Sequence, residues 1–240
     1  MQINPDKCIG CENCLDYCPL GAIKMRGSVA WIDPDPCVEC GTCYRSANCP
    51  AEAIERPELA WPRSIRQWFS DNSTRIPHLR SLGSGRGVDE VKNNDRTGYY
   101  KRGDVGFVVE VGRPGTSASF RDIEKLLRAM AAAGFMVTER SPLIPFLADR
   151  ERGILKKEIL GERVMTCSVE FKTKIEKIPE VIAVLRRLEP EVDTVFTVGV
   201  LSRVEPDGAI PTVPILKSLG IEPRPNAKIN VGLGRPLVTD

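Results

Sequence analysis

Eight of the nine cysteines in this chain of 240 residues lie in two runs within its first fifty residues. The first run reads Cys8-x2-Cys11-x2-Cys14-x3-Cys18-Pro19, and the second reads Cys37-x2-Cys40-x2-Cys43-x5-Cys49-Pro50. Three thiols spaced two residues apart converge from a short loop and can hold one face of a cubane iron–sulfur cluster. The fourth cysteine of each run, which precedes a proline, lies too far along the chain to close the same site easily. This spacing predicts iron–sulfur chemistry, and therefore the movement of single electrons.

Zinc and disulfide bonds are the alternatives for such a set of cysteines. Paired CxxC motifs build tetrahedral zinc sites, but zinc would use two pairs per ion and leave the third cysteine of each run and the Cys-Pro unexplained. Cysteine-dense disulfide frameworks belong to small exported domains, and we see no secretory signal in this sequence. Iron–sulfur ligation is the interpretation that uses all eight cysteines.

The two runs belong to a longer internal repeat. Residues 3–8 (Ile-Asn-Pro-Asp-Lys-Cys) match residues 32–37 (Ile-Asp-Pro-Asp-Pro-Cys), and residues 18–23 (Cys-Pro-Leu-Gly-Ala-Ile) match residues 49–54 (Cys-Pro-Ala-Glu-Ala-Ile). With these motifs, the segment resembles the bacterial-type two-[4Fe-4S] ferredoxins over residues 1–56. The resemblance implies two halves related by a pseudo-twofold axis, with Ile3 equivalent to Ile32 and Ile23 equivalent to Ile54.

The same resemblance implies that the halves exchange their last cysteine. The first cluster would then be held by Cys8, Cys11, Cys14 and Cys49, and the second by Cys37, Cys40, Cys43 and Cys18. One departure concerns the second run, where five residues (44–48) precede the final Cys-Pro in place of the family's three. We expect this insertion to lengthen the turn beside the first cluster without removing a ligand.

Composition and charge agree with a cytoplasmic protein. No run of apolar residues reaches the roughly 18 that a membrane-spanning helix needs, and a net charge of +2 is too small to indicate nucleic-acid binding. Residues 1–56 carry eight acidic and five basic side chains, a net charge of −3, so residues 57–240 carry +5. We therefore expect an anionic electron-transfer unit attached to a mildly cationic remainder.

Residues 57–104 form a basic connector that contains aromatic residues. A short helix beginning at Pro62 would place Ile65, Trp68 and Phe69 together. Aromatic and arginine side chains are enriched in protein interfaces, so a redox partner could bind here. The alternatives are that the aromatic residues only join the two units of the chain, and that the arginines are solvated surface charges. The residues considered for binding are Trp61, Trp68, Phe69, Arg63, Arg66, Arg86, Arg96, Lys101 and Arg102.

Residues 105–207 repeat a strand–helix–strand pattern. We predict strands at 105–112, 136–140, 164–171 and 194–204 and helices at 119–130 and 178–188, with Ser119 as N-cap of the first helix and Gly134 ending it. A charged hairpin around Gly153 separates the copies. This order predicts a βαββαβ sandwich. Residues 208–240 read as an extended docking tail with one short helix near 214–219, so the whole chain is of the α+β class.

Other residues with chemical potential have simpler interpretations. Cys167 alternates with polar neighbours in a predicted strand, which makes it a small buried apolar residue. His78 lies in a loop with no partner motif. The glycine clusters at 83–87 and 231–235 do not follow a strand and open a helix, so they fail the test for a nucleotide-binding loop. No catalytic set is evident, and we assign the chain no active site of its own.

These observations together predict an electron-transfer subunit of a larger oxidoreductase. Its arrangement resembles the iron–sulfur subunits that pair with flavoproteins of the adenylylsulfate-reductase and fumarate-reductase type, which implies a hetero-oligomer, a flavoprotein partner and a soluble electron donor. Two alternatives stay open. The first is a redox-linked regulator that uses the βαββαβ domain to bind a small molecule. The second is an enzyme that reduces its own substrate at a cluster, which is disfavoured because all eight cysteines are used as ligands and no iron is left open.

Overall fold

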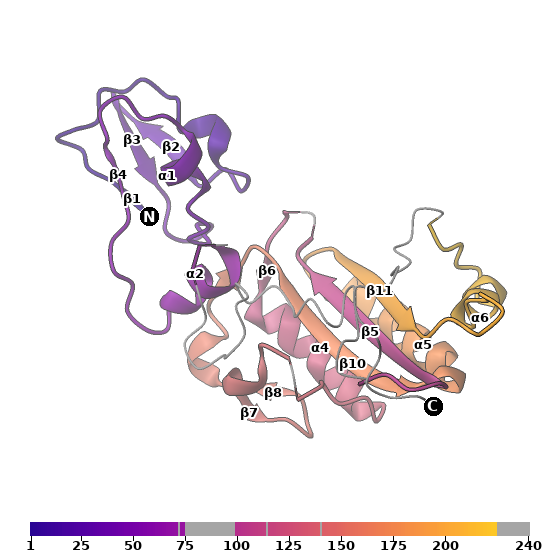
Figure 1. Cartoon of the computed structure of the whole chain (residues 1–240). Coiled ribbons are helices and arrows are strands. Elements are labelled where there is room, and N and C mark those ends of the chain that lie inside the picture. The colour runs from indigo at the N-terminus through magenta and orange to yellow at the C-terminus, as the bar shows by residue number, and fades with distance from the viewer. Residues whose placement is uncertain (72, 75–98, 114, 140, 225–240) are drawn as a thin grey trace.

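The computed structural model describes residues 1–71, 73–74, 99–113, 115–139 and 141–224 (Figure 1). The α-helices are α1 (Thr42–Ser46), α2 (Ser64–Ser70), α4 (Phe120–Ala132), α5 (Ile178–Leu188) and α6 (Thr212–Ser218). The strands are β1 (Gln2–Ile3), β2 (Ile23–Arg26), β3 (Val29–Ile32), β4 (Ile54–Glu55), β5 (Asp104–Val111), β6 (Ala118–Ser119), β7 (Leu147–Asp149), β8 (Ile154–Leu155), β9 (Arg163–Val164), β10 (Cys167–Lys174) and β11 (Phe196–Ser202). Short 3-10 turns are η1 (Leu15–Tyr17), η2 (Ile144–Phe146), η3 (Lys157–Ile159), η4 (Ile175–Lys177) and η5 (Glu189–Glu191).

The N-terminal unit holds two antiparallel pairs of strands that reproduce the sequence repeat. β1 pairs with β4, which sets Ile3 opposite Ile54, and β2 pairs with β3, which sets Ile23 opposite Ile32. Because Ile3 corresponds to Ile32 and Ile23 to Ile54 in the repeat, the two pairs are the same contact made twice. Ile23, Ile32 and Ile54 are buried, so this small core lies between the two cysteine loops.

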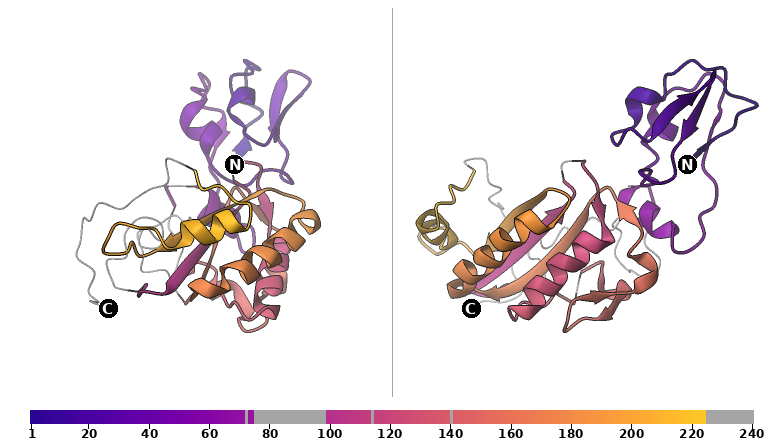
Figure 2. Two further views of the ribbon diagram at one scale, coloured as in Figure 1. Left: turned by 90° about the vertical axis from the view of Figure 1, so that its right-hand side faces the viewer. Right: turned by 180° about the vertical axis from the view of Figure 1, so that it is seen from behind.

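The C-terminal unit is a three-stranded antiparallel sheet in the order β10-β5-β11, and α4 and α5 pack together on one of its faces (Figure 2). Alternate residues of β5, from Val105 to Val111, contribute to the core between sheet and helices. On α4 the side chains of Ile123, Leu126, Leu127 and Met130 repeat at helical spacing and are buried. A helix with one apolar stripe gains its stability mainly from such packing.

The predicted ends of α4 are confirmed. Ser119 is the N-cap, and its hydroxyl oxygen accepts the main-chain N–H of Asp122 at 3.1 Å, which satisfies one of the first-turn amides. At the other end the chain turns at Gly134 with φ of +84°, a conformation that glycine adopts without steric cost. The hairpin expected around Gly153 is formed by β7 and β8.

The strand predicted at 136–140 is wrong as a full strand. Val137 makes a single antiparallel bridge with Phe171 at the outer side of β10, and the N–H of Thr138 donates to the Glu170 carbonyl at 2.8 Å. Directly afterwards the N–H of Ser141 bonds back to the Thr138 carbonyl, which turns the chain off the sheet edge before a ladder can extend. Arg140, and the segments 75–98 and 225–240, lie outside the described residues.

Helix α2 connects the two units. Its residues Ile65 and Phe69, four positions apart on one face, are fully buried in the core of the C-terminal unit, where the Phe69 ring meets Phe120 edge-on at 5.8 Å. The Ser70 hydroxyl accepts the N–H of Met165 at 2.8 Å, just past β9. Because this face of α2 packs against the C-terminal unit, the opposite face of the helix lies toward the cysteine loops.

Candidate iron–sulfur site

The eight cysteines of the two runs line two separate cavities in the N-terminal unit. One cavity encloses about 330 Å³, counting solvent at its mouth, and its lining includes Cys8, Cys11, Cys14 and Cys49. The other encloses about 340 Å³ on the same basis, and its lining includes Cys18, Cys37, Cys40 and Cys43. Each cavity therefore draws three thiols from one run and the Cys-Pro thiol from the other.

The Cys-Pro cysteines are held by equivalent local turns. The N–H of Ala22 donates to the Sγ of Cys18 at 3.1 Å, and the N–H of Ala53 donates to the Sγ of Cys49 at 3.4 Å. The repeat thus gives each cavity one sulfur that is already hydrogen-bonded to the main chain.

Three pairs of equivalent positions adopt left-handed backbone, and each pair consists of one glycine and one glutamate. The pairs, with φ between +47° and +70°, are Gly10 with Glu39, Gly41 with Glu12, and Gly21 with Glu52. A left-handed residue within each Cys-x2-Cys step turns the chain so that successive thiols face one cavity. Because a glutamate in this conformation costs roughly 1–2 kcal/mol, the surrounding structure must hold it there.

Burial raises the pKa of buried thiols in both cavities. Burial is the largest cause for Cys14, and the three other thiols of its cavity raise its pKa further. The pKa of Cys43 is raised to about 12, first by burial and then by the three other thiols of its own cavity. Such thiols stay protonated at neutral pH unless a positive charge stabilises the thiolate, which a coordinating metal provides.

The donor set fits a multi-iron cluster. The four thiols of each set surround a space, and four thiolates around one cavity are the ligands that [4Fe-4S] clusters use. The residues present therefore fit iron–sulfur clusters.

The two cavities differ sharply in what surrounds their loops. Three guanidinium groups donate hydrogen bonds to main-chain carbonyls of the second loop, residues 34–49. Arg45 donates to the Cys40 carbonyl at 2.8 Å and Arg63 to the Pro34 carbonyl at 3.1 Å. Arg66 donates to the Cys37 carbonyl at 2.7 Å. Among the described residues, no arginine or lysine side chain donates a hydrogen bond to a carbonyl of residues 5–18. The second cysteine loop is thus enclosed by its own chain, whereas Cys11 of the first loop is exposed.

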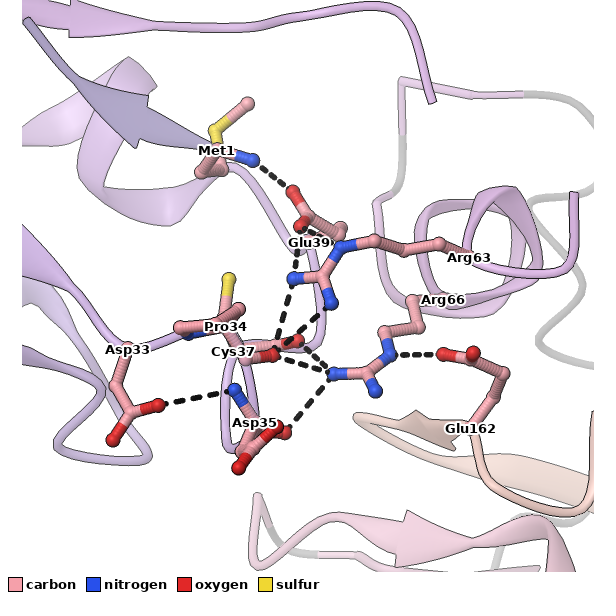
Figure 3. Close-up of polar contacts among 9 residues, drawn as sticks. All are labelled: Met1, Asp33, Pro34, Asp35, Cys37, Glu39, Arg63, Arg66 and Glu162. Atoms are coloured by element: carbon pink, nitrogen blue, oxygen red, sulfur yellow. Dashed lines mark hydrogen bonds and ion pairs between the residues drawn. The ribbon is translucent and has the colours of Figure 1, made fainter. Parts of the chain in front are cut away.

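Glu39 is a buried charge between two of these cysteines. Its carboxylate pairs with the Met1 amino group and accepts two hydrogen bonds from Arg63, at 2.7 and 2.9 Å (Figure 3). Only 1% of Glu39 is exposed, and a carboxylate buried to this degree requires such partners. Glu39, at a left-handed position of the loop, thereby connects the loop to the N-terminus and to the start of α2.

Asp71, the residue after α2, has a similar role behind the loop. Its carboxylate pairs with Arg45 and with Arg56, at 2.8 and 2.5 Å. Burial alone would raise the pKa of Asp71, but hydrogen bonds from Ser73 and the two guanidinium groups outweigh burial and lower it. Asp71 is therefore ionised at neutral pH and holds Arg45 against the loop.

These contacts revise the expectation for the basic connector. Arg63 and Arg66 donate hydrogen bonds to the second cysteine loop, and Phe69 is fully buried in the core. Trp68 is half-buried and stacks with Trp61 at 5.9 Å, and 43% of Trp61 is exposed. Arg86 and Arg96 lie outside the described residues, as do His78 and the glycine clusters at 83–87 and 231–235.

Sequence reasoning missed Glu39, Arg45 and Asp71. For Glu39 a signal was present, since the repeat sets this acidic residue opposite Gly10 between two ligand cysteines. Arg63 and Arg66 are three positions apart at the start of the predicted helix, which places them on one face. Their target could not be read from the sequence because it lies about thirty residues away, in a loop without regular structure.

Cys167 is separate from the site. It is fully buried in the core of the C-terminal unit, and burial raises its pKa. Expectation and structure agree that it is a packed core residue.

Comparison with known proteins supports the iron–sulfur assignment. The family model described as "4Fe-4S binding domain" matches residues 1–24. The chain is 48% identical to a subunit of the ion-translocating oxidoreductase complex of Methanosarcina acetivorans over 20% of this chain and 17% of that protein. It is 42% identical to the pyruvate synthase subunit PorD of Methanothermobacter marburgensis over 22% of this chain and 59% of that protein. These two relatives are thus matched over less than two thirds of their length, and no solved structure matches the chain.

The matched segment defines an iron–sulfur protein of the [4Fe-4S] type that functions in electron transfer. A ferredoxin of Saccharopolyspora erythraea is 31% identical over 35% of this chain and 73% of that protein. The chain belongs to the ferredoxin family through its N-terminal part. No described helix is long and apolar enough to cross a membrane.

Proposed function

We propose that the chain is the electron-transfer subunit of a larger oxidoreductase and relays single electrons through two [4Fe-4S] clusters. The observation that carries this proposal is the pair of four-cysteine cavities. The ligand sets we propose are Cys8, Cys11, Cys14 and Cys49 for the first cluster, and Cys37, Cys40, Cys43 and Cys18 for the second. When bound, each cluster accepts and returns one electron.

The protein residues give the two sites different access. At the first site Cys11 is exposed, and the neighbouring Ile9 is 68% exposed, so a partner can approach this sulfur closely. At the second site Cys37 and Cys43 are buried, and α2 lies beside the loop. We propose that exchange with an external protein takes place at the first site.

The partner we propose is a flavoprotein subunit, in a hetero-oligomer supplied by a soluble electron donor. Two relatives carry names of complex subunits, which supports a role as one component of an assembly. A flavin exchanges both one and two electrons, so it can couple single-electron transfer to a two-electron substrate reaction. The exposed face of Trp61 offers an apolar contact for such a partner.

We further propose four segments: a ferredoxin domain at 1–56, a connector at 57–104, a βαββαβ sandwich at 105–207 and a docking tail from 208. The strand order β10-β5-β11, with the Val137 bridge beyond β10, supports the sandwich, because it places the four β segments in the order expected of that motif. Within the tail, α6 packs on α5, and the Leu219 carbonyl accepts a hydrogen bond from Arg186 at 2.8 Å.

The test is anaerobic purification of the full chain from its source, followed by metal, sulfide and flavin analysis. We expect about eight irons and eight acid-labile sulfides per chain and a flavoprotein that co-purifies and accepts electrons from the reduced chain. A matched chain with Cys14→Ser and Cys43→Ser should still bind the partner but transfer no electrons. Zinc without sulfide would overturn the cluster assignment. If the purified chain binds a metabolite and delivers no electrons, the chain is a regulator and not an electron-transfer subunit.

The role of the added segments is tested separately. A version ending at residue 56, used only where analysis shows that it holds the same iron and sulfide per chain as the full chain, is compared with it for the rate of electron delivery to the same flavoprotein. We expect the short version to be slower because it lacks the proposed contact surface. Equal rates would show that the connector, the sheet unit and the tail are not a docking device.

A further inference from the structure

Arg66 links the second cysteine loop to the C-terminal unit through one guanidinium group. Its Nη1 donates to the carbonyls of Pro34, Asp35 and Cys37 at 2.9, 3.0 and 2.7 Å. Its Nε donates to the carboxylate of Glu162, which precedes β9 of the sheet unit. Figure 3 shows the guanidinium between Cys37 on one side and Glu162 on the other.

This charge is shielded from water. Arg66 is 6% exposed, and the Glu162 side chain is 15% exposed. Exposed charges act weakly because water and salt screen them, whereas charges buried beside a site act strongly. For comparison, the Lys24 side chain of the same N-terminal unit is 60% exposed, and it contacts the carboxylate of Asp33 rather than a carbonyl of the second loop.

We propose that Arg66 is the positioning residue that sets the reduction potential of the second site, and that Glu162 makes this potential depend on docking of the sheet unit. The inference rests on the proposed function. One-electron reduction adds one negative charge to the site, with no bond made or broken. A guanidinium that bonds to the carbonyl of a ligand cysteine stabilises the reduced form, and Glu162, on its far side, opposes this effect.

The physical consequence is that the two sites differ in reduction potential, although the sequence repeat gives them the same ligands. Glu39 lies within the second loop, but its charge is already paired with Arg63 and the Met1 amino group. Within the described residues, the first loop has no counterpart of Arg66. The potential of the second site is therefore adjustable from the C-terminal unit, while that of the first site is not.

The experiment is a redox titration of the full-length, anaerobically purified chain, followed by electron paramagnetic resonance. The two waves are assigned beforehand with Cys14→Ser and Cys43→Ser. Arg66→Met should shift the second-site potential to more negative values, and Arg66→Lys should give a smaller shift in the same direction. Glu162→Gln, which retains an acceptor for Nε, should shift it to more positive values. Lys24→Met is the matched control and should leave both waves in place.

The opposite signs separate an electrostatic role from a structural one. A loop that merely loosens would move both variants in the same direction, and that result would overturn the proposal. An unchanged second wave in Arg66→Met, or equal shifts of both waves, would also overturn it. If the wild-type chain contains no reducible clusters, the proposed function fails instead, which is a distinct outcome.

Discussion

Gly10 and Glu39 occupy the same place in the two cysteine loops, with φ of +70° and +58°, yet only one of the two positions has room for a side chain. A Cβ on Gly10 would clash with the carbonyl oxygen of Ser28 in the β2–β3 turn. Glu39 directs its side chain to Arg63 and the Met1 amino group instead. The repeat thus preserves the backbone of the loop but not its surroundings.

This contrast predicts different outcomes for two glycine substitutions. Gly10→Ala combines left-handed strain of about 1 kcal/mol with a clash against main chain, so we expect loss of iron from the first site and a clearly lower melting temperature. Gly21→Ala is the matched control, because φ is +61° there but nothing lies within 4 Å of the added carbon. It should cost only the strain. Similar melting temperatures and iron contents for the two variants would contradict the prediction.

Crossed ligation predicts that each Cys-Pro substitution acts on the cluster of the other run. Cys18→Ser should disturb the site that contains Cys43, and Cys49→Ser the site that contains Cys14, because those thiols share a cavity. The measurement is paramagnetic resonance of the reduced protein, with Cys14→Ser and Cys43→Ser as references. If each substitution damages the cluster of its own run, the two halves are independent sites.

Asp104 predicts a pH dependence for the sheet unit. Its carboxylate accepts a hydrogen bond from Lys174 at 2.7 Å and pairs with Lys172 at 2.9 Å. Burial alone would raise the pKa of Asp104, but these hydrogen bonds and one from the Lys101 N–H lower it to about 2. Because the folded-state pKa is below the unfolded value, the stabilisation is full above about pH 4 and is lost as the pH falls toward about 2.

The test compares Asp104→Asn with the wild type by thermal unfolding followed by circular dichroism. At pH 7 the variant should be less stable by about 2 kcal/mol, and this difference should shrink as the pH falls from 4 to 2. Glu205→Gln is the control, since its exposed pair with Arg102 contributes little. A difference that is independent of pH would rule out the ionic role of Asp104.

Arg63, the N-cap of α2, and Arg66, within α2, limit how far the ferredoxin unit can be shortened without loss of its second site. A chain ending at residue 56 lacks Arg63 and Arg66, so we expect its second site to lose iron to a chelator faster than its first. A chain ending at residue 74 keeps both arginines and Asp71, and we expect it to retain that iron longer. Release rates are followed by the absorbance of the iron–chelator complex. Equal rates at both sites of the shorter chain would contradict this.

The sequence predicted those parts of the fold that depend on local pattern. The repeat predicted that Ile3 corresponds to Ile32 and Ile23 to Ile54, and these residues occupy equivalent places in the two strand pairs. The ends of α4 were predicted from Ser119 and Gly134. The strand at 136–140 was predicted too long, because composition does not show the hydrogen-bonded turn that begins at Thr138.

The surroundings of the cysteine loops could not be predicted in the same way. Arg66 was expected at a partner surface, and its charge is used inside the chain, between Cys37 and Glu162. Glu162 is ninety-six residues away in sequence, so their contact arises only from the packing of α2 on the sheet unit. Residue types alone do not distinguish an arginine that binds its own chain from one that binds another.

The isolation of Cys167 provides an internal reporter of which part of the molecule fails first. Its thiol is fully buried and its pKa is raised, so alkylating reagents cannot modify it while the sheet unit is folded. Once the iron has been stripped and the small N-terminal unit has opened, the reagent should reach the other eight thiols and leave this one unlabelled. Counting the labels by mass spectrometry therefore distinguishes a chain that has only lost its metal from one that has also unfolded.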